Sequence, residues 1–99
     1  MKLKMYSVYD SKALVYGQPM FISAVGSALR SFADLCNDPQ SLVCKHPTDF
    51  VLFEIGEYDD STGVVTPTMP FVNLGMASDF KRVVKAPVVY EPAASEKGK

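Results

Sequence analysis

The chain has 99 residues, of which 47% are hydrophobic and 21% are charged, and its formal net charge is −1. These values are typical of one globular domain and exclude an intrinsically disordered chain. A nearly neutral chain has no global positive field, so nucleic-acid binding would require a local basic patch.

The first predicted element is a strand over residues 2–9, where polar and apolar side chains alternate. We expect Leu3 and Met5 to point into the core, which places Lys2, Lys4 and Tyr6 on the other face. Asp10-Ser11-Lys12 should end this strand as a turn. Residues 13–21 are interrupted by a glycine and a proline and are expected to form a loop.

The clearest helix is predicted over Ser23–Asn37, with Ser23 as the N-cap. Apolar residues recur at spacings of three and four and form one stripe: Val25, Ala28, Leu29, Phe32, Leu35 and Cys36. Asn37-Asp38-Pro39 should end the helix, because the residue before a proline disfavours helical backbone angles.

Residues 40–49 are expected to form a loop that holds a short apolar anchor at Leu42-Val43-Cys44, followed by a buried strand over Phe50–Tyr58. An acidic turn over residues 59–63 then predicts a hairpin, with residues 63–66 returning antiparallel. Pro67 and Pro70 should make this returning strand short or place it at an edge, because proline donates no ladder hydrogen bond.

The remaining residues are harder to assign. Residues 71–75 are ambiguous, and Met76–Val84 fits either a short helix or a strand. We therefore predict an α+β domain over residues 1–86, with a small antiparallel sheet of three or four strands packed against one main helix. Residues 87–99 are expected to form a flexible, disordered C-terminal tail.

No catalytic or metal-binding motif stands out. His46 has no acid–base partner nearby in sequence, the acidic residues Asp59 and Asp60 suit a turn, and Cys36 lies on the apolar stripe. We expect no enzyme, cofactor or metal. The start of the sequence lacks the continuous apolar core of a signal peptide, and no membrane-spanning run is present. We expect a reducing cytoplasm, in which the two cysteines are free.

One set of residues suggests a binding surface. Lysines at alternating positions of a strand are about 6.6 Å apart, close to the spacing of phosphates on an extended single strand, and a neighbouring tyrosine could stack on a base. Further cations could extend the patch. The candidate DNA-binding residues are Lys2, Lys4, Tyr6, Lys12 and Arg30, with a second patch at Lys81, Arg82 and Lys85. Alternatively, these lysines only solvate an outward face or protect an edge strand.

Three segments carry a family resemblance: residues 1–13, residues 28–39 and residues 45–60, the last containing Lys45-His46-Pro47 and Leu52-Phe53-Glu54-Ile55-Gly56. Together they resemble the small nonstructural protein of gokushovirus-type microviruses, which are single-stranded DNA phages. The resemblance implies a nonstructural protein that takes part in single-stranded genome synthesis and packaging and binds DNA, and it supplies no catalytic residues.

We therefore expect a non-enzymatic accessory protein in the host cytoplasm that binds DNA, single-stranded in preference to double-stranded, with an affinity that falls steeply as salt rises. A homodimer or higher homo-oligomer would strengthen a weak patch, with subunit contacts at residues 64–70 and 69–72. The alternative is a protein-interaction module that recruits a host replication factor or a capsid precursor through Glu57–Asp60 or the C-terminal tail.

Overall fold

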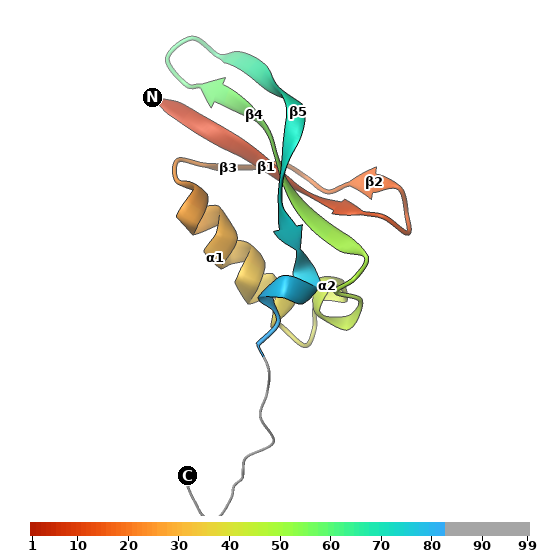
Figure 1. Ribbon diagram of the computed structural model, residues 1–99. Helices are drawn as coiled ribbons and strands as arrows, with labels where there is room; N and C mark the ends of the chain where they lie inside the picture. Colours follow the sequence, from red (N-terminus) through yellow and green to blue (C-terminus); the bar gives the residue numbers. More distant parts are fainter. Residues whose placement is uncertain (83–99) are drawn as a thin grey trace, which may run out of the picture.

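The computed structural model describes residues 1–82, which form a mixed α+β fold (Figure 1). A five-stranded antiparallel sheet, with the order β2-β1-β4-β5 and β3 also paired to β1, packs against one main helix, α1. The predicted fold class is confirmed, with one strand more than the three or four expected. Expectations for residues 83–99, which include Lys85 and the tail, lie outside the described residues.

Strand β1 (Lys2–Asp10) is central in the sheet. It pairs with β4 along one edge and with two short strands along the other, β2 (Val15–Tyr16) and β3 (Met20–Ile22). The expectation of a plain loop over residues 13–21 was therefore wrong. The chain follows the free edge of β1, and the Gly17 amide donates to the Val8 carbonyl at 2.8 Å between the two short strands.

Strands β4 (Phe50–Asp59) and β5 (Val64–Met76) form the predicted hairpin. Of the two alternatives expected for this strand, short or at an edge, the edge position is the one found, and β5 has 13 residues. The register between the two strands shifts near Ile55, and Pro67 and Pro70 are accommodated at an outer edge that requires no donors toward a further strand.

Helix α1 spans Val25–Cys36. The N-cap is Ala24, without a side-chain cap, so the prediction for Ser23 was wrong: β3 runs to Ile22, and the extended backbone continues to Ala24 before the first helical residue. The predicted end at Asn37 is confirmed, and its side-chain amide donates to the carbonyls of Ala33 (2.7 Å) and Phe80 (3.0 Å).

Two short helical segments complete the layer beside α1. Helix α2 (Leu42–Lys45) coincides with the predicted apolar anchor, and the Ser41 hydroxyl accepts from the Val43 amide at 3.0 Å. A 3₁₀ turn, η1 (Ala77–Phe80), follows β5, so the ambiguous residues 71–80 divide into the end of a strand and a short helical turn.

The core lies between the sheet and these helical segments. Its buried apolar members are Tyr6, Ala28, Phe32, Cys36, Val43, Leu52 and Ala77. Tyr6 and Val8, not Leu3 and Met5, point toward α1, so the predicted orientation of β1 was wrong. One face of β1 carries Lys2, Lys4 and Tyr6. Its start at Lys2 is exposed, and the same face is fully buried by the time it reaches Tyr6.

Candidate nucleic-acid interface

The first part of the predicted basic patch is neutralised by neighbouring carboxylates. The Lys4 ammonium lies 3.7 Å from a Glu54 carboxylate oxygen and 3.8 Å from one of Glu57. Lys2 of β1 is paired in register with Asp59, which lies on β4 as Glu54 and Glu57 do. The acidic side chains of β4 therefore offset the positive charge that the first strand would present to a phosphate.

Tyr6 cannot take the predicted stacking role. Its side chain is fully buried among core residues, so no face of its ring is open to a base. Its hydroxyl has no hydrogen-bond partner within residues 1–82. Burial, together with the negative charge of Glu54, raises the pKa of this hydroxyl. Tyr6 is a core residue of β1, and its assignment as a DNA contact is corrected.

The other predicted cations lie on separate elements. Lys12 lies in the turn between β1 and β2, and Arg30 is exposed on α1. Lys81 and Arg82 follow η1, where the Lys81 ammonium donates to the Cys44 carbonyl at 3.2 Å and Arg82 lies 4.0 Å from the Asp34 carboxylate. Lys2 and Lys12 are roughly 30 Å apart along β1, so the structure does not gather these residues into one patch.

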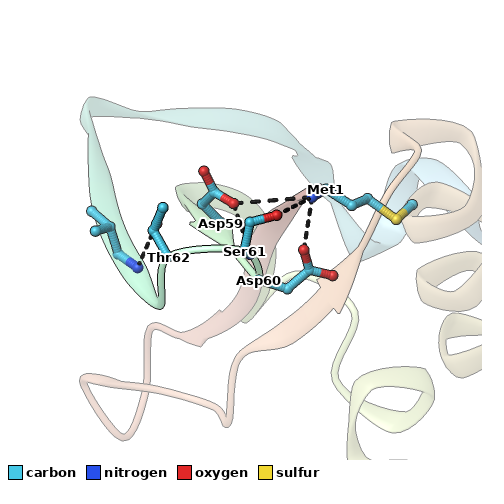
Figure 2. Close-up of polar contacts among 6 residues, drawn as sticks. Met1, Asp59, Asp60, Ser61 and Thr62 are labelled. Atoms are coloured by element: carbon cyan, nitrogen blue, oxygen red, sulfur yellow. Dashed lines mark hydrogen bonds and ion pairs between the residues drawn. The ribbon is translucent and has the colours of Figure 1, made fainter.

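The acidic turn of the β4–β5 hairpin is also occupied. The Met1 ammonium donates to the Asp60 carboxylate at 2.7 Å and to the Ser61 hydroxyl at 3.1 Å, and it lies 4.0 Å from the Asp59 carboxylate (Figure 2). The hydrogen bond to Asp60, with smaller help from both carboxylate charges, raises the pKa of this amino group. The N-terminus thus offsets part of the charge that a recruitment surface at Glu57–Asp60 would use.

Four aromatic side chains gather on the face of the sheet that points away from α1. We call Tyr9, Tyr16, Phe53 and Phe71 the aromatic quartet. The rings of Tyr9 and Tyr16 have centroids 4.5 Å apart, and Phe71 lies 5.7 Å from Tyr16 and 6.4 Å from Phe53. The Tyr16 and Phe71 residues are 47% and 38% exposed. Rings of this kind, open to solvent, can stack on nucleobases.

The helical segments do not cover this face. Tyr6 and Leu52 belong to the same core cluster as residues of α1, α2 and η1, so their side chains point toward the helical segments. The residues next to Tyr6 and Leu52 along each strand point to the other face. The register of pairing then gives the members of the helix-free face, among which no acidic or basic residue occurs. In β1, β4 and β5 they include Leu3, Met5, Ser7, Tyr9, Val51, Phe53, Gly56, Tyr58, Val65, Pro67, Phe71 and Asn73.

Lys12 is the predicted cation that lies nearest to the quartet in sequence, three residues after Tyr9 and four before Tyr16. It lines an open cavity of about 270 Å³ with Asp10, Asp49, Leu42, His46 and Phe50, on the side of the sheet where α2 lies. Of the seven predicted contacts within residues 1–82, Lys12 is the exposed cation nearest in sequence to the quartet.

The quartet could have been found only in part from the sequence. Tyr9 follows Val8 and Phe53 follows Leu52, and successive strand residues point to opposite faces. Assigning Val8 and Leu52 to the core would therefore have placed the rings of Tyr9 and Phe53 on the outer face. Tyr16 and Phe71 gave no such signal, because their places depend on the pairing of β2 and on the register shift in β5.

Comparisons with known proteins give one match. A family model described as Phage ORF5 protein matches residues 3–80. No curated protein and no solved structure matches the chain. Within residues 1–82 no helix is long and apolar enough to cross a membrane, and no group of three or more histidine, cysteine, aspartate or glutamate side chains could hold a metal ion.

Proposed function

Because this chain belongs to the Phage ORF5 protein family, and is thus a phage accessory protein, we propose that it binds single-stranded DNA without catalysing a reaction. It would act during viral genome synthesis or packaging in the host cytoplasm. The resemblance to the nonstructural protein of gokushovirus-type microviruses supports this role. The observation that carries the proposal is the aromatic quartet on a sheet face that no described helix covers.

The quartet suits single strands because every base offers a flat face, whereas bases inside a duplex are already stacked. Tyr9 and Phe53 lie on the two central strands, and the rings of Tyr16 from β2 and Phe71 from β5 meet above them, with centroids 5.7 Å apart. Stacking on such rings is worth about 1–3 kcal/mol per base and depends little on sequence. The protein should therefore bind single strands of any sequence with modest affinity.

The charges of the chain fit binding by stacking better than binding by phosphate contacts. Lys4 is paired with Glu54 and Glu57, and the helix-free face carries no charge within residues 1–82. With Lys12 as the main phosphate contact, log K should fall with log salt at a slope of about −0.7, the value for one contact on a single strand. This replaces the steep salt dependence expected from the sequence.

Fluorescence anisotropy with labelled single-stranded DNA tests the proposal. Tyr16→Ala and Phe71→Ala should each weaken binding about tenfold, within the range that loss of one stacked base predicts. Val72→Ala is the matched control, because Val72 is 42% exposed next to Phe71 but pairs with Glu54 on the opposite face. Equal affinities for wild type and both aromatic variants would contradict the proposal.

A second candidate function rests on the same lack of charge. A sheet face without charges also suits burial against a protein, such as a capsid precursor or a host replication factor. This candidate predicts no binding of single-stranded DNA at low salt and loss of a protein complex on Phe71→Ala. The anisotropy measurement separates the two functions directly.

We also propose that the protein forms a homodimer or higher homo-oligomer through the outer edge of β5. Val64, Val65 and Met69 on this strand are 55%, 55% and 76% exposed. An oligomer joined at this edge would carry several quartets and multiply a modest affinity. Light scattering should show a mass of at least two chains, and Val64→Lys should reduce it to one.

A further inference from the structure

A second aromatic cluster occupies the same face of the sheet, nearer the N-terminus. Phe21 on β3 and Tyr58 on β4, here called the aromatic pair, have ring centroids 5.6 Å apart. Phe21 is paired in register with Met5 and Tyr58 with Leu3, which places both rings on the helix-free face. The Phe21 residue is 46% exposed, as much as the outer rings of the quartet.

The spacing of the two clusters is set by β1. Phe53 of the quartet lies opposite Ser7, and Tyr58 of the pair lies opposite Leu3. Four residues of strand separate these positions, which corresponds to about 13 Å. An extended single strand covers this distance with about two nucleotides, so bases on the two clusters would belong to one short stretch of DNA.

The surface between the clusters is formed by small and apolar residues. Gly56 lies there, buried and without a side chain, opposite Met5. Ser7 is fully buried, and its hydroxyl donates to the Gly17 carbonyl at 2.8 Å. The side chain between the two sets of rings is that of Met5, whose sulfur lies 3.4 Å from the position of a Cβ on Gly56, so the strand would cross an apolar thioether there.

We propose that the aromatic pair is a second stacking site for the same DNA strand that the quartet binds. The inference rests on the proposed function and adds to it a minimum length, because a strand must span both clusters to gain the full affinity. Two bases on each cluster and one between them make that length about five nucleotides, near the lower end of the site sizes known for single-strand binding folds. The strand would run along β1 and β4, with its bases on the sheet and its phosphates toward solvent.

A second copy of the chain is a weaker occupant for the pair. A stable protein interface buries about 800 Å² on each partner. Two aromatic side chains supply at most about 500 Å² even when fully buried. The rings are large enough to hold a base and too small, by themselves, to hold a subunit.

The test compares two lengths of oligo-dT, of about two and about eight nucleotides, by fluorescence anisotropy, because the shorter strand is too short to join the clusters. Phe21→Leu and Tyr58→Leu keep apolar bulk at each position while they remove the ring. Each should weaken binding of the longer strand about tenfold and change binding of the shorter strand less than twofold. Val25→Ala, on α1 and 46% exposed like Phe21, is the matched control and should change neither. Circular dichroism melts establish that each variant folds.

The outcomes distinguish this inference from the function on which it rests. An unchanged affinity for the longer strand, or equal losses at both lengths, would overturn the second site while the quartet variants still lost binding. A fall in oligomer mass with DNA affinity unchanged would assign the pair to a subunit contact and also overturn it. If wild-type protein bound neither length, the proposed function itself would fail.

Discussion

Replacement of Lys4 by methionine separates the stacking account from the basic-strand account. Lys4 lies between two carboxylates at 3.7 and 3.8 Å, with its side chain 43% exposed and that of Glu54 only 17% exposed. At these distances one pair has a gross Coulomb energy of about 1–4 kcal/mol, but partly exposed pairs retain a net of only about 0.2–1 kcal/mol. Loss of both pairs should therefore cost about 1 kcal/mol of folding free energy.

Urea denaturation measures this cost, and a double-mutant cycle with Glu54→Gln isolates the contribution of one pair. DNA affinity should change less than twofold, because the carboxylates already offset the Lys4 charge. Lys12→Met is the comparison, since this exposed lysine is the proposed phosphate contact; it should lower affinity a few-fold and flatten the salt dependence. If Lys4→Met left stability unchanged and weakened DNA binding at low salt more than Lys12→Met did, the reasoning would be refuted.

Three further predictions concern single groups. Tyr6→Phe removes a buried hydroxyl that has no partner within residues 1–82, so urea melts should show equal or higher stability and anisotropy an unchanged DNA affinity. Gly75→Ala should cost about 1–3 kcal/mol in the same melts, because φ is +133° and an added Cβ would lie 2.8 Å from the Phe80 ring. The raised pKa of the Met1 amino group adds stability that is full below pH 8.0 and is lost as pH rises through its higher folded value; Asp60→Asn should abolish that change in melts across this range.

The sequence predicted those elements that local patterns determine. The apolar stripe of α1 and its end at Asn37 follow from helical periodicity and the Asn-Asp-Pro signal, and the β4–β5 hairpin follows from its acidic turn. Elements that depend on tertiary pairing could not be predicted. The two short strands exist only because β1 offers them an edge, and β5 extends past its prolines only because it lies at the border of the sheet.

The site was misjudged because alternation gives two faces of β1 without saying which one is buried. Lysines at the start of the strand suggested that their face was outward, yet the same face continues to Tyr6 under α1. The carboxylates that pair with Lys4 come from β4, so the sequence of β1 alone could not show that its charge is offset. Two rings of the quartet come from β2 and β5, so the aromatic face could not be predicted from one segment either.

The salt dependence of single-stranded DNA binding tests the central claim most directly. Anisotropy titrations of wild-type protein from about 50 to 200 mM salt give the slope of log K against log salt. Stacking on the aromatic quartet with Lys12 as the main phosphate contact predicts measurable binding with a slope of about −0.7. A slope of about −4 or steeper would show that phosphate contacts dominate, and would contradict the account, as would the absence of binding at the lowest salt.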